Sequence, residues 1–249
     1  MATTPPGPAP TVVAAEHWTS RLLSTAGGKF GILLIALVAL MAAAPLIIAG
    51  PVSITVLALF TGAVLVASLH AARPGGRPVV LGLALALTDF LIGRCTISFG
   101  TRWLFLLQIV LWMSTLLYVT ATILQAVFAS REVTLSTLLA ALCVFLLIGL
   151  FGAFAFTLID LTLPGSFQTS HGPGVVWADE RSRATEFMRL FVFSYGTLSG
   201  SNSAEITPAT GFASNVASLE AMTGQIYLAV VIARLVGLHA TPRPRDAAG

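Results

Sequence analysis

The chain has 249 residues, of which 56% are apolar and only 9% are charged, with a net charge of +3 at pH 7. Soluble domains carry about 25% charged residues, so this composition excludes a water-exposed globular surface and is typical of a polytopic helical membrane protein. The basic residues are scattered along the chain, which argues against nucleic-acid binding as a function.

Both ends of the chain are expected to lie outside the folded domains. Residues 1–28 form a leader that is either an interfacial helix or loosely ordered, and they lack the basic-then-apolar order of a cleavable signal peptide. Residues 240–249 are expected to be a disordered tail. Cys95 and Cys143 lie in apolar segments, the histidines lack ligand spacing and no catalytic motif is present, so we predict no enzyme, cofactor or metal site.

The first domain, predicted over residues 29–130, holds four apolar stretches. Each is close to the length of about 20 residues that crosses the bilayer core as a helix. Voltage sensing needs arginines at every third position along a span, but the fourth stretch has only Arg102 at its start before the next charge at Arg131. We therefore expect a four-helix membrane domain without a voltage sensor. The four stretches cover residues 30–49, 52–72, 79–99 and 103–129.

A second domain is predicted over residues 131–239. Its short helix, over residues 184–198, spans only about 22 Å and is too short to cross a membrane. Polar, irregular backbone at membrane depth is tolerated only where it is buried in protein or lines a water-filled cavity. We therefore expect the short helix and the turn after it to form a re-entrant element. The segments in order are an apolar stretch at 133–163, a polar loop at 166–183, the short helix, a polar turn at 199–205 and a sixth apolar stretch at 212–238.

Three motifs of this second domain, at residues 197–199 (TLS), 205–208 (EITP) and 219–230 (LEAMTGQIYLAV), resemble segments of the pore domain of the potassium-channel superfamily. Residues 197–199 (TLS) match the end of the family's pore helix, and residues 205–208 (EITP) match its D-I-T-P segment. Residues 219–230 (LEAMTGQIYLAV) are similar to the L-E-A-x-x-G-Q-x-Y-L-A-V inner helix of bacterial potassium-channel-like proteins. The resemblance covers residues 184–238, with the fifth stretch matching by position and the first four by count.

The resemblance implies an all-α membrane protein with six transmembrane helices and a re-entrant pore helix. It also implies a homotetramer with the pore on its axis, in the plasma (inner) membrane. With both termini in the cytoplasm, eight basic residues lie on the inner side and five on the outer side, as the positive-inside rule favours. The expected partners are other copies of the chain, lipids and permeant ions.

The turn departs from the family at the filter. Where the family has T-V-G-Y-G, this chain has Gly200, Ser201, Asn202, Ser203 and Ala204. A potassium filter lines up backbone carbonyls, which needs left-handed backbone that glycine adopts at little cost. Because Asn202 and Ala204 stand in place of the two glycines, and Gly200 in place of the threonine, the sequence argues against a dehydrated, potassium-selective filter.

The turn has two interpretations. One is a wider, hydrated mouth with a ring of Glu205, which would favour cations and conduct with weak selectivity. The other is a closed turn, which would make the protein a non-conducting membrane scaffold or accessory subunit. A small transporter is a further class, against which the lack of an internal repeat argues.

The candidate functional residues follow from these interpretations. On the sixth stretch, Glu220 is either a cavity-side charge or contact behind the filter, or a structural glutamate hydrogen-bonded to the pore helix, for example at Thr197 or Ser199. Gly224 is either a hinge or a site of close helix packing, and Thr223 and Gln225 are candidates for the cavity wall. The filter and pore-lining candidates are Thr197, Ser199, Gly200, Ser201, Asn202, Ser203, Ala204 and Glu205.

Overall fold

The computed structural model describes residues 27–49, 88, 102–130, 134–170, 177, 180–201 and 205–240. Most of the predicted leader and tail therefore lie outside the described residues. The second predicted apolar stretch, at 52–72, is also outside them, as is the third, at 79–99, except for Thr88.

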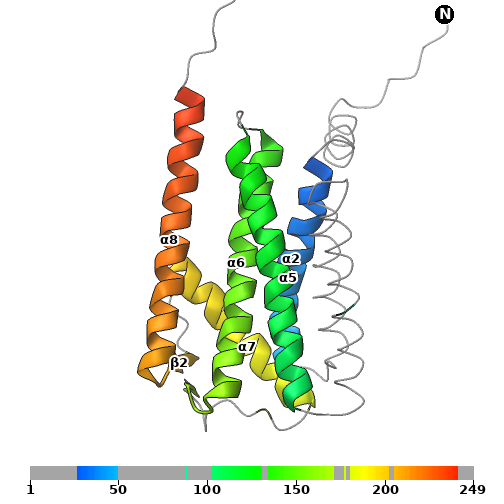
Figure 1. Cartoon of the computed structure of the whole chain (residues 1–249), viewed down its shortest axis with the longest axis vertical. Helices are drawn as coiled ribbons and strands as arrows, with labels where there is room; N and C mark the ends of the chain where they lie inside the picture. The colour runs from blue at the N-terminus through cyan, green and yellow to red at the C-terminus, as the bar shows by residue number, and fades with distance from the viewer. Residues whose placement is uncertain are drawn as a thin grey trace, which may run out of the picture.

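Five helices hold most of the described residues (Figure 1). The four predicted apolar stretches that can be compared all form helices, and each helix begins and ends within three residues of its predicted bounds. The helices are α2 (Gly27–Ala49), α5 (Arg102–Ala129), α6 (Leu135–Thr162), α7 (Glu180–Ser199) and α8 (Gly211–Ala240).

Three of the described helices contain segments that are long and apolar enough to cross a membrane. These segments are Trp103–Ala129 in α5, Leu135–Thr162 in α6 and Gly211–Arg234 in α8. They support the predicted class of helical membrane protein.

The short helix α7 is longer than the sequence predicted. It begins at Glu180 rather than at residue 184, and it ends at Ser199. The charged residues before the predicted start are good helix formers, and an acidic residue in the first turn is favourable at the positive end of the helix dipole. The helix therefore extends into the segment that was expected to be a polar loop.

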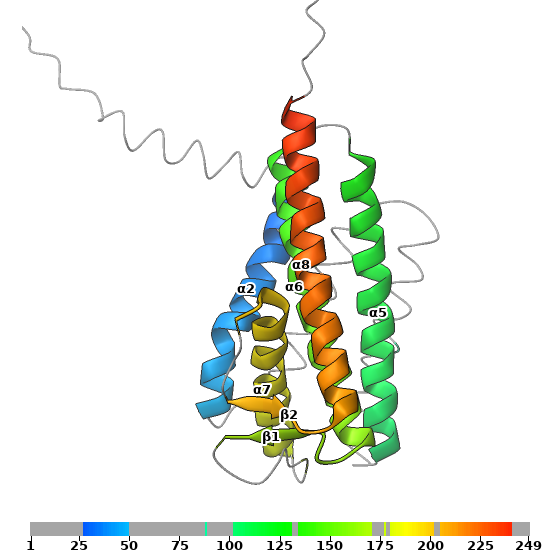
Figure 2. The ribbon, with the colours of Figure 1, turned by 90° about the vertical axis from the view of Figure 1, so that its left-hand side faces the viewer.

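Helix α6 is the centre of the described bundle, because α2, α5, α7 and α8 all pack against it (Figures 1 and 2). Its first turn is capped by Thr134, whose side chain accepts a hydrogen bond from the backbone N–H of Thr137 at 3.3 Å. In the most apolar 18-residue window of α6, 56% of the residues are buried, against 11% in that of α8. In a single chain, most of the surface of α8 is therefore exposed.

A two-stranded antiparallel sheet joins the segment after α6 to the segment before α8. Strand β1 (Phe167–Thr169) pairs with β2 (Ile206–Pro208), with Gln168 opposite Thr207. The sequence did not predict this sheet, since each strand has only three residues and lies in a segment that was expected to be a loop. The strands hold together because the first residue of each, Phe167 and Ile206, is fully buried.

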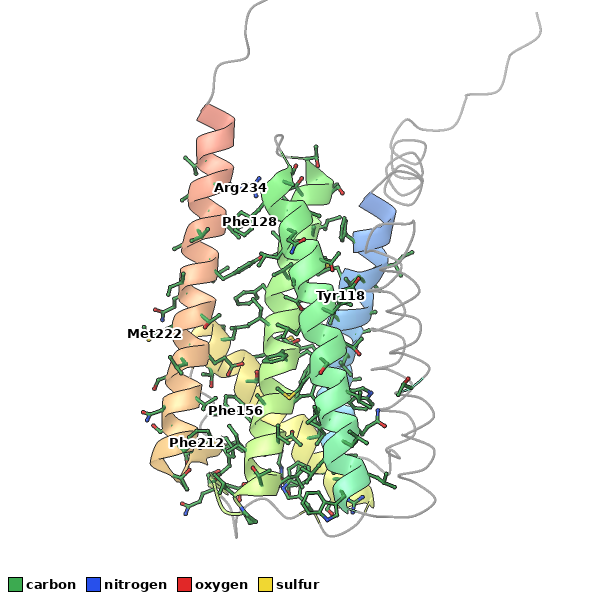
Figure 3. The ribbon with its side chains drawn as sticks, viewed as in Figure 1. Tyr118, Phe128, Phe156, Phe212, Met222 and Arg234 are labelled. Atoms are coloured by element: carbon green, nitrogen blue, oxygen red, sulfur yellow. The ribbon has the colours of Figure 1, made fainter. Side chains whose placement is uncertain are left out.

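The sheet is anchored to the helices at its buried face. Phe156 of α6 (labelled in Figure 3), Phe167 of β1 and Phe193 of α7 pack as three mutually contacting rings, with centroids 5.2 to 5.8 Å apart. Beside them, the buried carboxylate of Asp160 accepts hydrogen bonds from Trp177 Nε1 at 2.7 Å and from the backbone N–H of Phe167 at 3.3 Å. This end of the bundle is therefore fixed by both apolar packing and hydrogen bonds.

At the opposite end, Arg234 ties α8 to the C-terminal end of α5. Its guanidinium donates to the backbone oxygens of Val127, Phe128 at 2.8 Å and Ser130 at 2.5 Å. It also lies over the ring of Phe128, 5.1 Å from the centroid, and Figure 3 shows the two side chains reaching toward each other. The last carbonyls of a helix have no partner within that helix, so a cation placed there satisfies them and the negative end of the dipole.

Replacing Arg234 with alanine should lower the free energy of unfolding by about 1–3 kcal/mol, because three backbone oxygens lose a charged donor. Thermal unfolding of the detergent-solubilised protein, followed by circular dichroism, measures this change. The control is Arg234→Lys, which keeps the charge but not the planar guanidinium. Its unfolding midpoint should lie between those of the wild type and Arg234→Ala. An unchanged unfolding midpoint in Arg234→Ala would show that these hydrogen bonds do not stabilise the fold.

Candidate functional site

Helix α7 ends against the middle of α8. A Cβ atom added at Gly224 would lie 2.1 Å from the backbone oxygen of Leu198, so the backbones of the two helices are in direct contact there. Gly224 lies thirteen residues after Gly211, the first residue of α8, which corresponds to about 20 Å along the helix axis. The end of α7 is therefore at about half the length of a membrane-length segment.

The chain then returns to the end of the bundle from which α7 began. Figure 2 shows α7 rising beside α8 from the end that holds the sheet, with β2 lying back at that same end. Gly200, with φ +76°, makes the reversal, and its N–H donates to the backbone oxygen of Thr197 at 3.1 Å. A left-handed glycine after the last helical residue is a common way to end a helix.

The turn after α7 is polar and exposed. Ser199, Gly200 and Ser201 are all exposed, and the hydroxyls of Ser199 and Ser201 are hydrogen-bonded to each other at 2.9 Å. Gln225 of α8 is also exposed. It lies beside the turn, because a Cβ added at Gly200 would be 3.7 Å from the Gln225 amide nitrogen. The structure therefore brings together four of the predicted site residues at one place.

The other predicted site residues are placed as follows. Thr197 is half-buried in the last turns of α7 and Glu205 is exposed just before β2. Thr223 is exposed too, but it is two residues from Gln225, or about 160° away around the helix, and its hydroxyl donates to Leu219 O of its own helix at 2.7 Å. Thr223 and Gln225 therefore do not share one wall. Asn202, Ser203 and Ala204 lie outside the described residues.

Glu220 is hydrogen-bonded to α7, as one of the two interpretations of this residue predicted, but at a different residue. Its Oε1 lies 2.5 Å from Ser194 Oγ, not at Thr197 or Ser199. Ser194 Oγ is in turn 2.6 Å from the backbone oxygen of Gly149 in α6. Three helices therefore meet through one serine hydroxyl.

Two glycines of α6 make this junction sterically feasible. A Cβ at Gly152 would lie 1.8 Å from Glu220 Oε1, and one at Gly149 would lie 2.7 Å from the ring of Tyr195. The Tyr195 hydroxyl donates to Leu146 O at 2.6 Å. Small residues that let polar groups and backbones approach closely are the usual means of packing helices in membranes. Gly224 has the close-packing role that one interpretation of the sequence assigned to it.

Glu205 is paired with a residue that the sequence analysis did not single out. Arg189 of α7 lies with its Nε 3.3 Å from Glu205 Oε1, a charge contact rather than an aligned hydrogen bond, and with its Nη1 3.1 Å from Glu186 Oε1. Burial raises the pKa of Glu186, and the neighbouring Arg189 guanidinium acts in the opposite direction. The pore-side carboxylate predicted at Glu205 is therefore partly neutralised within its own chain.

Several residues that hold this site were not predicted from the sequence. Asp160 could have been found, because an ionisable residue inside an apolar stretch is costly unless it has a partner. Arg189 also carried a signal, being a cation in a helix with an acidic residue three positions earlier. Ser194 and Tyr195 gave none, since their importance depends on which residues of α6 and α8 lie opposite them.

The comparisons with known proteins leave the site to be interpreted from its geometry. No family model, curated protein or solved structure matches the chain. Within the part of the chain that the structure describes, no three His, Cys, Asp or Glu side chains come together as metal ligands.

Substituting alanine at Gly224 should displace the end of α7, because the added methyl group would meet the backbone oxygen of Leu198. Such overpacking destabilises by about 1–3 kcal/mol. The matched control is Gly237→Ala in the same helix, where nothing lies within 4 Å and alanine should be neutral or slightly stabilising. Thermal unfolding compares the two, and equal midpoints would contradict the close contact.

Proposed function

We propose that this chain is one subunit of a homotetrameric ion channel of the potassium-channel type, in a plasma membrane. In this proposal α6 is the outer helix, α7 the re-entrant pore helix and α8 the inner helix. The turn after α7 lines a hydrated, weakly selective pathway. The observation that carries the proposal is that α7 ends at half the length of α8 in an exposed polar turn, after which the chain returns to the side from which it came.

Lipid cannot cover such a turn. Exposed hydroxyls and backbone groups have no hydrogen-bond partners in hydrocarbon, so irregular backbone at this depth needs protein or water around it. A single chain leaves Ser199, Gly200, Ser201 and Gln225 exposed. We therefore infer that copies of the chain surround these residues and enclose water on a common axis.

The exposed surface of α8 is a second observation that supports assembly. Its long exposed surface carries a row of large apolar side chains at helical spacing, and Met222 points away from α6 in Figure 3. We assign this row to contacts with neighbouring subunits. The number of four subunits rests on the resemblance of residues 184–238 to the potassium-channel superfamily. The row consists of Phe212, Leu219, Met222, Ile226 and Val230.

The chemistry of the turn favours hydrated cations. A potassium filter presents successive rings of backbone carbonyls. In this turn, Gly200 has no side chain and Ser201 presents a hydroxyl. Glu205 adds a negative charge near the mouth, with 48% of its side chain exposed, but Arg189 offsets part of it. We therefore expect a preference for cations over anions and little discrimination between potassium and sodium.

Reconstitution into liposomes tests the proposal. The purified full chain should have the mass of a tetramer in detergent, and its vesicles should pass potassium and sodium at similar rates, well above those of empty vesicles. A monomer, or a flux selective for potassium, would contradict the proposal. A tetramer whose flux does not exceed that of empty vesicles would instead identify the non-conducting scaffold that the sequence left as the alternative.

Chemical labelling of a cysteine introduced at the turn tests whether ions pass this turn. In a background with Cys95 and Cys143 replaced by serine, a methanethiosulfonate reagent should block most of the flux through Ser201→Cys, because the modified side chain fills the mouth. The control is Leu142→Cys, since Leu142 is 51% exposed on α6 and its modification should leave the flux unchanged. Complete labelling of Ser201→Cys without loss of flux would show that ions do not pass this turn.

A further inference from the structure

The junction of α6, α7 and α8 contains two short contacts between three oxygen atoms. Ser194 Oγ lies 2.6 Å from Gly149 O and 2.5 Å from Glu220 Oε1. Both separations are in the range of O–H···O hydrogen bonds, and each needs a proton between its two oxygens. Two oxygens this close without a proton would repel each other, so two protons must be accounted for.

Only one of these protons can come from Ser194. A serine hydroxyl carries a single proton, and a backbone carbonyl oxygen carries none. An ionised carboxylate is an acceptor only, so it could not supply the second proton. Glu220 can supply it as a carboxylic acid, with Glu220 Oε1–H donating to Ser194 Oγ, and Ser194 Oγ–H donating to Gly149 O.

We propose that Glu220 is a neutral carboxylic acid, and that the chain of hydrogen bonds from Glu220 through Ser194 to Gly149 positions the end of α7 against α6 and α8. Ser194 is one helical turn before Leu198, whose backbone rests on Gly224. The hydrogen bonds therefore fix the height at which the turn of Ser199–Ser201 sits. The positioning of an ion pathway rests on the proposed function, whereas the protonation of Glu220 does not.

The surroundings of Glu220 offer no charge that would stabilise a carboxylate. Its other oxygen, Oε2, is buried and has no hydrogen-bond partner among the described residues. On the α6 side, Glu220 Oε1 meets Gly152, and on α7 the titratable Tyr195 follows Ser194, with its hydroxyl already donating to Leu146 O. An unpaired carboxylate buried here would be far more costly than a neutral acid.

Among the described residues, no cation forms a salt bridge with Glu220. Arg189 lies five residues before Ser194 on α7 and is engaged with Glu186 and Glu205. Arg234 lies fourteen residues beyond Glu220 on α8 and is bonded to the end of α5. These separations correspond to about 7.5 Å and about 21 Å along the respective helices.

Glutamine is the substitution that separates the proton from the charge. Glu220→Gln keeps the size of the side chain and a donor that can reach Ser194 Oγ, but it cannot ionise. Glu220→Ala removes the donor, and Ser194→Ala removes the link to Gly149. If the acid acts as proposed, Glu220→Gln should preserve thermal stability and flux, while Glu220→Ala should lower the unfolding midpoint by several degrees and reduce the flux.

Infrared difference spectroscopy of the purified full chain tests the proton directly. The spectrum of the wild type minus that of Glu220→Gln at neutral pH should contain the carbonyl stretch of a protonated carboxylic acid, and this band should shift in heavy water. In Ser194→Ala the band should move, because the acid loses its acceptor. A difference spectrum with only carboxylate bands, or a band that Ser194→Ala leaves unchanged, would overturn the proposal.

The pH dependence gives a second readout that a purely structural glutamate would not give. Raising the pH should replace the acid band of the wild type with carboxylate bands and lower its unfolding midpoint, because ionisation removes a donor and buries a charge. Glu220→Gln should show a smaller loss over the same range, and an equal loss in both proteins would count against the proposal. Absence of flux in every protein, with the acid band present, would defeat the proposed channel and leave the protonation of Glu220 standing.

Discussion

The constraint on which the rest of this structure depends is the place where α7 ends. A helix that stops halfway along a membrane-length neighbour leaves polar backbone where lipid offers no hydrogen bonds. The chain meets this constraint by packing α7 tightly onto α6 and α8 before the turn. Glycines at 149, 152 and 224 remove side chains from the three contact points, so that Tyr195, Glu220 and the backbone of Leu198 fit there.

The contacts that hold α8 differ along its length. Near its start, the sheet and the aromatic cluster around Phe156 fix the segment that enters the helix. At its middle, Glu220 and Gly224 fix it to α7. Beyond these, the described side-chain hydrogen bonds to other helices come from Tyr227, which donates to Ala141 O at 2.7 Å, and from Arg234. The start of α8 is thus fixed by a buried core, and beyond Gly224 two side chains supply the hydrogen bonds to other helices.

Much of the helical framework could be predicted from the sequence, because apolar length decides which segments can span a bilayer. The bounds of α5, α6 and α8 followed from runs of apolar residues ended by charged or helix-breaking residues. The sheet could not be predicted, since three-residue strands have no periodicity to detect. The partner of Glu220 could not be predicted either, because sequence spacing shows which residues share a helix face but not which residue of another helix lies opposite.

The packing of α7 and the composition of the turn depend on different residues, which would allow the proposed channel to combine a potassium-channel-like arrangement with a different filter. The residues that hold α7 in place are Ser194, Tyr195 and Leu198 before the turn, and Ile206 after it. Gly200 and Ser201 form none of these contacts; their described interactions are confined to the turn, α7's last residues and the neighbourhood of Gln225. A change at Ser201 therefore alters what lines the turn without loosening what positions it, whereas Gly200 is also needed for the left-handed backbone of the reversal. In the proposed channel, the ion preference and the fold would therefore be set by different residues.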